Sequence, residues 1–447
     1  MTYDKKISLF LTLATLLTAI ASSIAQVNEV GNTTFKITVE GEELKIPYYF
    51  TKPLDELNND VNTLVISQHG TNRNAADYRL SMFTAAVEAN KKDQSLVIAP
   101  QFLREIDINT FNLADDYLFW SNNGWKVGDL SQNTDSNPRP SRISSFEVMD
   151  LMIMSVLNSG NFPNIDKVVL AGFSAGGQYI NRYAASNLIH DEVKQTFDIE
   201  MEYMVGAPSS YVYMNDERRV MGTTDEFEAG APGSCPEFNE YKYGLNDINT
   251  YLSITGPNAI IEQYKTRKIL YAVGSEDNDP DGNAVDNSCP AVLQGEHRLE
   301  RGMIYFNYLK HFYGPEIEEL QSFVSIPEVG HSHNPLFRSK EVRDWIFNRP
   351  GVTTSKDNLS IGTFSLRAYP NPMKSFSELS YFLPNHEHVS LKIADLNGRV
   401  IRELVNTVQT QGPHTVRWET DSQPNGLYIL QLQVKDKLKT IPIIVTQ

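Results

Sequence analysis

The first part of the chain alternates between short apolar runs rich in β-branched residues and segments with helical periodicity. The later apolar runs are unbroken, as expected for parallel strands that are buried on both faces. The expected strands span 35–39, 44–50, 63–67, 96–99, 167–171, 201–205, 269–273 and 322–326. Between two of them, Ser144 begins a segment whose apolar stripe is typical of an amphipathic helix. Eight strands with interposed helices predict a doubly wound, mostly parallel α/β sheet over residues 26–350.

The pattern changes after Phe347. Residues 351–362 are polar without a sustained period, which is typical of a linker. From Thr363 to Gln447 the chain alternates with period two, and turns rich in Asn and Gly separate the alternating runs. The expected strands here span 379–383, 389–395, 399–405, 414–419, 427–434 and 440–445. Closely spaced strands without helices predict a small C-terminal antiparallel β-sandwich over 363–447.

The first 25 residues have the order of a secretory signal. Lys5 and Lys6 precede an apolar run at 7–20, and small residues follow it up to Ala25, where cleavage is expected. The run has 14 residues, fewer than the roughly 20 that a membrane-spanning helix needs. No second run of this kind occurs in the sequence. We therefore expect an exported protein whose mature chain has no transmembrane segment.

Composition is that of an ordinary globular protein, with 41% hydrophobic and 21% charged residues. The 55 acidic residues outnumber the 39 basic ones, which gives a formal net charge of −16. Such an excess repels phosphate backbones and disfavours nucleic acid as a partner.

Only two cysteines occur, Cys235 and Cys289. Export to an oxidising space favours a disulfide between them, with two buried thiols as the alternative.

The stretch GFSAG places Ser174 between two glycines, each two residues away. It follows the apolar run at 167–171 and precedes a segment that can be helical. A nucleophilic serine on a strained strand-to-helix turn needs such small neighbours, because larger side chains would clash. The pattern is weak alone, since it is common by chance. In this context it predicts a nucleophile at Ser174 rather than a small packing residue.

A nucleophilic serine needs a base, and an acid that orients the base. The acid is expected after a later strand, where Asp277 follows the run at 269–273 and Asp279 is the nearest competitor. The base is expected after the last strand, where we favour His331 over His333. The resulting chain order of serine, aspartate and histidine is the order that α/β-hydrolases use.

The same reaction needs hydrogen-bond donors for the oxyanion. One donor is expected from the backbone N–H of Ala175, directly after the serine, and the other from the loop after the third strand. That loop reads His69-Gly70-Thr71, so the Thr71 amide is the expected second donor, and Gly70 allows the backbone to approach closely. The alternative is an ordinary glycine turn.

Residues 30–347 resemble the α/β-hydrolases, nearest in style to secreted esterases of the feruloyl-esterase and polyhydroxybutyrate-depolymerase type. The motifs that carry the resemblance are HGTNRNAADY (69–78), GFSAGG (172–177), GSED (274–277) and VGH (329–331). The resemblance implies a serine hydrolase that works through an acyl-enzyme, without a metal or an organic cofactor.

The C-terminal segment resembles the type A sorting domain of the type IX secretion system. The similar motifs are AYPNPMKSFSELSYFLP (368–384), VSLKIADLNGRVIREL (389–404), GPHTVRWE (412–419) and NGLYILQLQV (425–434). Met373 departs from the pattern, because an aromatic residue commonly follows YPNP. The resemblance implies export across the outer membrane of a Bacteroidetes-type cell, with the type IX machinery as a partner, and then release or surface attachment. A carbohydrate-binding β-sandwich is the alternative.

The loop after 269–273 opens like an EF-hand calcium loop, with Asp277, Asp279 and Asp281 at ligand spacing and Gly282 after them. Ser288 stands where the closing glutamate is required, so the motif is incomplete. A calcium ion held by Asp279, Asp281 and Asp286 is therefore only the alternative to a solvated acidic loop.

Aromatic residues gather in two loops beside predicted strands or helices. The expected pocket residues are Trp120, Trp125, Tyr211 and Tyr213. Rigid aromatic walls would suit a sugar or an aryl group. Packing in the core is an equal alternative for these four side chains.

These observations predict a secreted carboxylic-ester hydrolase in which Ser174, His331 and Asp277 form a catalytic triad. The expected substrate is a small-molecule or polysaccharide-linked ester. A serine peptidase on the same fold is the close alternative, because the same triad cleaves amides. A non-catalytic surface binding protein is the alternative from another class.

Overall fold

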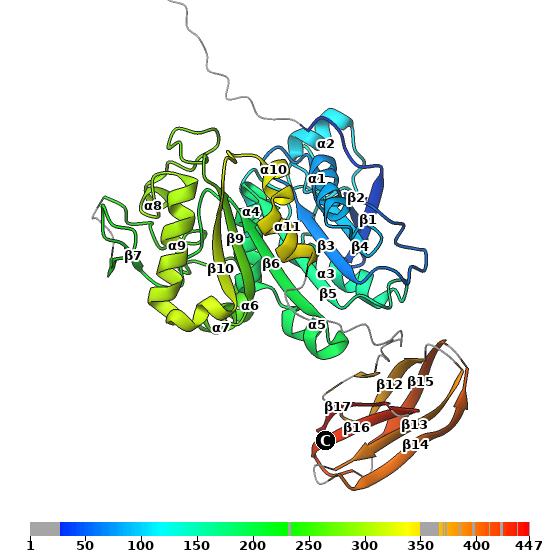
Figure 1. Cartoon of the computed structure of the whole chain (residues 1–447). Coiled ribbons are helices and arrows are strands. Elements are labelled where there is room, and N and C mark those ends of the chain that lie inside the picture. Colours follow the sequence, from blue (N-terminus) through cyan, green and yellow to red (C-terminus); the bar gives the residue numbers. More distant parts are fainter. Residues whose placement is uncertain are drawn as a thin grey trace, which may run out of the picture.

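The computed structural model describes residues 27–230, 234–348 and most of 366–446 (Figure 1). Within the last segment, positions 370, 372, 384–385, 396–397, 411, 421–422 and 436 are not described. The expected secretory signal at 1–25 and the expected linker at 351–362 lie outside the described residues.

An eight-stranded sheet forms the centre of the N-terminal unit. In spatial order its strands are β1 (Thr33–Val39), β2 (Glu42–Phe50), β4 (Ser95–Pro100), β3 (Thr63–Gln68), β5 (Lys167–Phe173), β6 (Glu200–Gly206), β9 (Lys268–Gly274) and β10 (Gln321–Ile326). Strand β2 pairs antiparallel with both β1 and β4, and all the other pairings in this sheet are parallel. Each of the eight expected strands has its counterpart, so the predicted mostly parallel sheet is confirmed.

Helices cover both faces of this sheet. On one face lie α1 (Ala75–Glu88), α10 (His333–Arg338) and α11 (Lys340–Phe347), and on the other lie α3 (Ser145–Asn158), α4 (Ala175–Ser186), α7 (Pro257–Tyr264) and α9 (Arg298–Tyr313). Along β3, Leu64 and Ile66 pack into one of the two cores and Val65 into the other. Because both faces of the strand are buried, its sequence is an unbroken apolar run rather than an alternation.

The remaining elements of this unit are short. They are α2 (Glu105–Phe111), η1 (Gly124–Val127), α5 (His190–Phe197), β7 (Glu217–Arg219), β8 (Phe227–Ala229), α6 (Thr250–Thr255), α8 (Cys289–Val292) and η2 (Pro315–Glu319). Among the residues that the structure describes, no helix combines the length and the apolar character that crossing a bilayer requires.

The C-terminal unit is a β-sandwich, as predicted. One sheet contains β11 (Leu366–Tyr369), β12 (Phe376–Leu383) and β15 (Gly412–Glu419). The other contains β14 (Val400–Gln409), β13 (Glu387–Ala394), β16 (Gly426–Val434) and β17 (Lys437–Val445). All pairings are antiparallel, and inward-facing side chains of the two sheets share one core. Met373, the departure from the sorting-domain pattern, is fully buried in that core.

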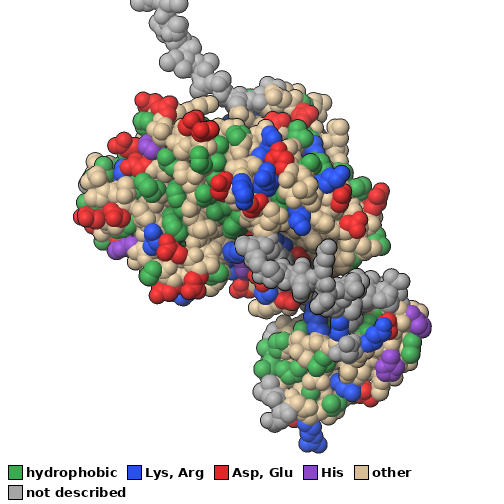
Figure 2. Space-filling model, in the orientation of Figure 1, with side chains coloured by type: hydrophobic (Ala, Val, Ile, Leu, Met, Phe, Trp, Pro, Cys, Tyr) green, Lys and Arg blue, Asp and Glu red, His purple; other side chains and the backbone are tan. Residues whose placement is uncertain are grey.

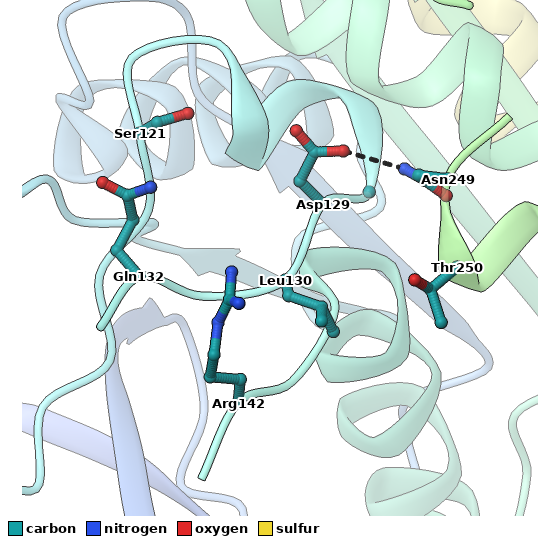
Figure 3. Close-up of a pocket in the computed structure, with 8 residues that line it drawn as sticks. Ser121, Asp129, Leu130, Gln132, Arg142, Asn249 and Thr250 are labelled. Atoms are coloured by element: carbon teal, nitrogen blue, oxygen red, sulfur yellow. Dashed lines mark hydrogen bonds between the residues drawn. The ribbon is translucent and has the colours of Figure 1, made fainter. Parts of the chain in front are cut away.

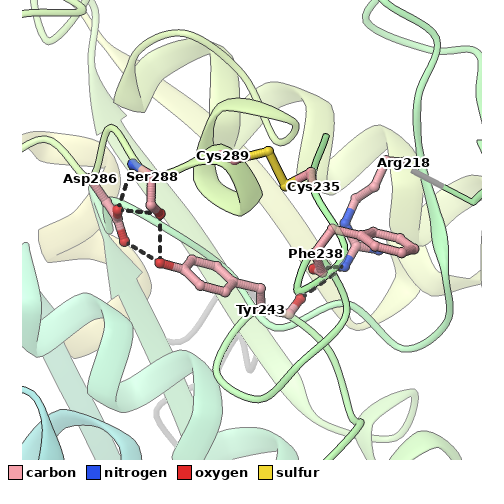
Figure 4. Close-up of a disulfide and its surroundings, with 7 residues drawn as sticks. All are labelled: Arg218, Cys235, Phe238, Tyr243, Asp286, Ser288 and Cys289. Atoms are coloured by element: carbon pink, nitrogen blue, oxygen red, sulfur yellow. Dashed lines mark hydrogen bonds between the residues drawn. A yellow bond between two sulfur atoms is a disulfide. The ribbon is translucent and has the colours of Figure 1, made fainter. Parts of the chain in front are cut away.

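A disulfide joins Cys235 to Cys289, with a Cα–Cα distance of 5.9 Å (Figure 4). Cys235 is buried in an irregular loop, and Cys289 begins α8. Near the bridge, Tyr243 donates to Asp286 Oδ2 at 2.8 Å, so these two loops are also held by a hydrogen bond. The bridge closes a segment of 54 residues.

Removing the bridge is expected to destabilise the N-terminal unit. A crosslink of this sequence separation lowers the entropy of the unfolded chain by an amount worth about 4 kcal/mol in the chain-entropy model. The double variant Cys235→Ser/Cys289→Ser is therefore expected to lose roughly 2 to 4 kcal/mol of unfolding free energy, measured by urea titration with near-UV circular dichroism. Dithiothreitol-reduced wild type serves as the control and should match the variant. Equal stability of variant and oxidised wild type would contradict the prediction.

Candidate active site

Ser174 lies on a sharp turn between β5 and α4. Its backbone has φ 60° and ψ −119°, a conformation that non-glycine residues rarely adopt and that costs about 1 to 3 kcal/mol. Its N–H donates to the Gly206 carbonyl at 2.8 Å, which ties the turn to the end of β6. The side chain is thereby held at the carboxyl end of the central strand and at the start of a helix.

Three glycines make this turn possible because other backbones pass directly beside them. A Cβ atom at Gly172 would lie 2.3 Å from the Gly176 carbonyl oxygen. One at Gly176 would lie 2.4 Å from the Gln68 carbonyl oxygen, and one at Gly177 would lie 2.2 Å from the Gly206 carbonyl oxygen. Helix α4 therefore contacts the ends of β3 and β6 through bare backbone.

The structure brings the three predicted side chains into one hydrogen-bonded chain. His331 Nε2 lies 3.0 Å from Ser174 Oγ, and His331 Nδ1 lies 2.6 Å from Asp277 Oδ2. An ionised carboxylate only accepts, so Nδ1 carries the ring proton and Nε2 is left free to accept from the serine hydroxyl. The Asp277 side chain is 4% exposed and the His331 side chain 25% exposed. The His331 ring is therefore accessible from outside, while the carboxylate of Asp277 behind it is buried.

Two loops fix the positions of Asp277 and His331 relative to each other. The Glu276 N–H donates to the Val329 carbonyl at 2.9 Å, and Ser275 N–H donates to the Ile326 carbonyl at 2.8 Å. A Cβ atom at Gly274 would lie 2.0 Å from the Val329 carbonyl oxygen. The loops after β9 and β10 are thus joined by backbone contacts just before they deliver Asp277 and His331.

Arg298, the first residue of α9, supports the acid from the other side. Its Nη1 donates to Asp277 Oδ1 at 3.2 Å, and its Nη2 donates to the Asn283 carbonyl at 2.6 Å. Both side chains of this ion pair are almost fully buried. The two oxygens of Asp277 therefore have different partners, one the imidazole and the other the guanidinium. The sequence offers no local signal for this arginine, because it comes from a distant helix.

The two competing residues lie elsewhere. Asp279 is exposed, and its Oδ1 accepts from the Asp281 N–H at 3.0 Å. His333 begins α10, and its ring stacks on Tyr78 with centroids 4.1 Å apart. Burial lowers the pKa of His333 to about 4. Neither residue takes part in the hydrogen-bonded chain at Ser174.

The loop after β3 lies beside the elbow. A Cβ atom at Gly70 would lie 2.5 Å from the Tyr78 hydroxyl and 3.6 Å from the Phe173 carbonyl oxygen. Together with the contact between Gly176 and the carbonyls of residues 68 and 69, this puts Gly70 and Thr71 next to the first turn of α4. The N–H of Ala175 belongs to that first turn, where backbone donors have no partner within the helix.

His69 fixes the orientation of the next peptide. The Phe102 N–H donates to His69 Nε2 at 3.0 Å, so the ring proton is on Nδ1, which donates to the Gly70 carbonyl at 2.9 Å. That carbonyl also accepts from the Arg73 N–H at 3.0 Å. In a trans peptide the N–H points opposite to the carbonyl, so the Thr71 N–H is turned away from these partners. Burial lowers the pKa of His69 to about 3, and the ring is neutral at all ordinary pH values.

The prediction of an aromatic pocket is wrong for all four residues. Trp120, Trp125, Tyr211 and Tyr213 are at most 1% exposed and belong to the main core. Tyr211 stacks on Tyr305 of α9 with centroids 4.3 Å apart, and Trp125 lies against His69 at 4.6 Å. The loops that carry these residues pack against helices, so the four aromatic rings belong to the core and do not line the site.

The acidic loop does not assemble a calcium site. Among the described residues, which include all of 273–288, no group of three or more acidic, histidine or cysteine side chains is arranged to hold a metal ion. Asp286 instead forms an ion pair with Lys242 at 3.1 Å and accepts from Tyr243 and Ser288 (Figure 4). The calcium alternative is therefore not supported.

The structure also contains a polar cavity of about 260 Å³ (Figure 3). It is lined by Ser121, Gly128, Asp129, Leu130, Gln132, Arg142, Asn249 and Thr250. Asn249 donates to Asp129 Oδ1 at 3.0 Å, which joins the loop after η1 to the start of α6. Burial raises the pKa of Asp129. None of the lining residues belongs to the chain of Ser174, His331 and Asp277.

The strand order and the strand–turn–helix at Ser174 are those of the α/β-hydrolase fold. Residues 367–446 match the family model described as the secretion system C-terminal sorting domain. The expected α/β-hydrolase fold and the resemblance of the C-terminal segment to a secretion sorting domain are thereby confirmed. Proteins with this sorting domain leave the cell through the type IX secretion machinery, so the chain is exported to the cell surface or the extracellular space.

Several solved structures are similar to the chain. Poly(aspartic acid) hydrolase-1 from Sphingomonas sp. KT-1 is 21% identical, with a TM-score of 0.45 over 71% of this chain and 99% of that chain. The poly(3-hydroxybutyrate) depolymerase LpqC from Bordetella parapertussis is 17% identical, with a TM-score of 0.45 over 72% and 93%. Latent PorU from Porphyromonas gingivalis is 21% identical, with a TM-score of 0.17 over 20% and 10%. The sequence matches no curated protein.

The close contact between Gly176 and neighbouring carbonyl groups leads to a prediction about stability. Gly176→Ala would place a methyl group within 2.6 Å of two carbonyl oxygens that cannot move independently of β3. We expect it to lower the unfolding free energy by roughly 1 to 3 kcal/mol, measured by urea titration. Gly330→Ala is the matched control, because a Cβ atom there meets nothing within 4 Å. Equal stability of the two variants would show that the close approach at Gly176 is not a constraint.

Proposed function

We propose that the chain is an exported serine hydrolase that cleaves carboxylic esters. The observation that carries the proposal is the continuous hydrogen-bonded chain from Ser174 Oγ through the His331 ring to Asp277. The proposal is further supported by the strained backbone of Ser174 and by the loop of Gly70 and Thr71, which lies beside this residue. Strain at a buried serine that also contacts an accessible imidazole is typical of a nucleophile elbow.

In the first half of the reaction, Ser174 Oγ attacks the ester carbonyl carbon, and its proton passes to His331 Nε2. The carbonyl oxygen becomes an oxyanion, which accepts hydrogen bonds from the N–H groups of Ala175 and Thr71. Each such donor is worth about 2.7 to 4 kcal/mol in transition-state stabilisation. The tetrahedral intermediate collapses, and the leaving alcohol takes the proton from His331. An acyl-enzyme on Ser174 remains.

In the second half, water attacks the acyl carbon while His331 Nε2 accepts its proton. Collapse of the second tetrahedral intermediate returns that proton to Ser174 Oγ and releases the carboxylic acid. Asp277 keeps the Nδ1–H tautomer in place and stabilises the imidazolium that forms in each half. Arg298 holds the other Asp277 oxygen, so the carboxylate cannot rotate away from the ring.

Replacing the nucleophile is the direct test. Ser174→Ala is expected to lower kcat for 4-nitrophenyl acetate and butyrate by at least about 10³-fold, because the covalent step is lost. A fluorophosphonate probe should label the wild type but not the variant. Ser322→Ala, an exposed serine on β10, is the control and should keep full activity. Wild-type-like turnover by Ser174→Ala would remove this residue from the nucleophile role, and cleavage of peptides but not esters would favour a peptidase.

The identity of the acid can be tested against its neighbour. Asp277→Asn preserves the shape of the side chain but removes the negative charge, and we expect kcat to fall by roughly 10³- to 10⁴-fold. Asp279→Asn is the matched control two residues away, where the carboxylate is exposed. Esterase activity with both substrates should distinguish the two variants clearly. A larger loss in Asp279→Asn than in Asp277→Asn would overturn the assignment.

A further inference from the structure

We propose that Arg73 is a positioning residue of the active site: its guanidinium, fixed by Asp107, holds the loop of Thr71 so that the Thr71 N–H is directed toward the developing oxyanion. Arg73 follows the proposed donor by two residues, in the loop between β3 and α1. The inference rests on the proposed hydrolase function and deepens it, because it states what keeps one of the two oxyanion donors in place.

Arg73 and Asp107 form a bidentate ion pair in the interior of the protein. Arg73 Nε donates to Asp107 Oδ2 at 2.8 Å, and Arg73 Nη2 donates to Asp107 Oδ1 at 3.0 Å. The Arg73 side chain is 1% exposed and the Asp107 side chain is fully buried. Two parallel hydrogen bonds fix the plane of a guanidinium as well as its position. The third nitrogen, Nη1, therefore points in a fixed direction.

This third nitrogen holds the loop of the proposed oxyanion donor. Arg73 Nη1 donates to the Thr71 carbonyl at 2.9 Å. The peptide before Thr71 is held through the Gly70 carbonyl, which accepts from His69 Nδ1 at 2.9 Å and from the Arg73 N–H at 3.0 Å. The carbonyl oxygens on both sides of Thr71 thus have fixed partners. Since the N–H of Thr71 points opposite to the Gly70 carbonyl, its direction is fixed as well.

Asp107 is itself anchored by two other parts of the chain. The Arg104 N–H at the start of α2 donates to Asp107 Oδ2 at 2.8 Å, and the Val27 N–H donates to Asp107 Oδ1 at 3.3 Å. The carboxylate accepts these two bonds in addition to the two from Arg73, so all of them together oppose its rotation. Helix α2 and the N-terminal segment therefore both stabilise the position of the Arg73 guanidinium.

Gln101, directly after β4, connects the backbone of Arg73 to the same N-terminal segment. Its Nε2 donates to the Arg73 carbonyl at 3.0 Å and to the Glu29 carbonyl at 2.9 Å, and its Oε1 accepts from the Gly31 N–H at 3.1 Å. Gln101 is 1% exposed, so these bonds are shielded from water. Both the backbone and the side chain of Arg73 are thus bonded to buried residues, which lie 28 and 34 positions away in the sequence.

The backbone of Arg73 shows the effect of these contacts. Its φ is 56°, in the left-handed region that a residue with a β-carbon rarely adopts. Such a conformation persists where the surrounding contacts enforce it, and residues of this kind cluster at active sites. Because Asp107 neutralises the guanidinium, Arg73 acts on the reaction through the geometry of the loop rather than through its charge.

The test replaces the forked guanidinium by a single ammonium group. Arg73→Lys keeps the positive charge beside Asp107, but one ammonium cannot bind the carboxylate in a fork and also reach the Thr71 carbonyl in the same geometry. For 4-nitrophenyl butyrate we expect kcat to fall roughly 10- to 100-fold, because a displaced donor stabilises the transition state less. KM should change by less than about twofold, since the donor acts in the transition state rather than on the bound ester.

A transition-state analogue distinguishes a displaced donor from a general loss of folded enzyme. Ser174 Oγ adds to the carbonyl carbon of trifluoromethyl propyl ketone, its proton passes to His331 Nε2, and the carbonyl oxygen becomes the oxyanion of an adduct that has no leaving group. The inhibition constant of this ketone should rise in Arg73→Lys by about the same factor by which kcat/KM falls. Partial unfolding would lower kcat but leave the inhibition constant unchanged, because it only reduces the number of active molecules.

Arg267→Lys is the matched control and should keep the kcat and the inhibition constant of the wild type. Arg267 is also buried and pairs with Asp191 at 3.0 Å, but it precedes β9, whereas Asp277 follows the other end of that strand. Asp107→Asn is the second test variant, because it keeps an acceptor for Arg73 but removes the charge that orients the fork. Each variant is assayed where near-UV circular dichroism shows it to be folded.

Unchanged kcat and inhibition constant in folded Arg73→Lys or Asp107→Asn would overturn the positioning role and leave the hydrolase proposal intact. A lower kcat with an unchanged inhibition constant, or a higher KM with an unchanged kcat, would overturn the positioning role as well. If the wild type neither hydrolyses the ester nor binds the ketone, the hydrolase proposal fails, and the positioning role fails with it. The same two measurements therefore distinguish the failure of one proposal from the failure of both.

Discussion

The close approach of bare backbones around Ser174 is the constraint on which the rest of the site depends. Helix α4 begins against the ends of β3 and β6, with carbonyl oxygens where side chains would otherwise lie. The packing forces Ser174 into positive φ, and its N–H bond to Gly206 helps to offset the cost. The same packing brings the loop of Gly70 beside the elbow. The proposed nucleophile and the proposed oxyanion donors are therefore positioned by one set of contacts.

His69 and Asp277 are both buried next to the site, but their hydrogen-bond and charge partners differ. His69 is held neutral because its ring is desolvated and both nitrogens have fixed partners. Asp277 is equally buried but lies between Arg298 and the His331 ring, and such partners stabilise a buried carboxylate. His69 thus has a fixed structural proton, whereas the His331 ring is partly exposed and hydrogen-bonded to the serine, as the proposed role of a base requires.

The sheet, the sandwich and the meeting of Ser174, Asp277 and His331 could be predicted because each follows from local pattern and strand order. Parallel strands end at one edge, so residues just after β5, β9 and β10 must come close. Arg298 could not be predicted, because only tertiary packing brings α9 to the acid. The aromatic loops were ambiguous for the same reason. A tryptophan or tyrosine suits a pocket wall and a core equally. The sequence around Trp125 and Tyr211 does not indicate that helices from elsewhere in the chain cover them.

Charged side chains far from Ser174 and those close to it differ in how strongly solvent and salt screen them. Acidic side chains are spread over the visible surface, in keeping with the net charge of −16 (Figure 2). At physiological ionic strength the Debye length is about 8 Å, so distant surface carboxylates are largely screened at the nucleophile. Arg298 and Asp277 instead form a direct ion pair whose side chains are both almost fully buried, where screening is weak. The groups that act on the His331 ring beside Ser174 are therefore its buried neighbours, and the net charge of the chain has little influence on them.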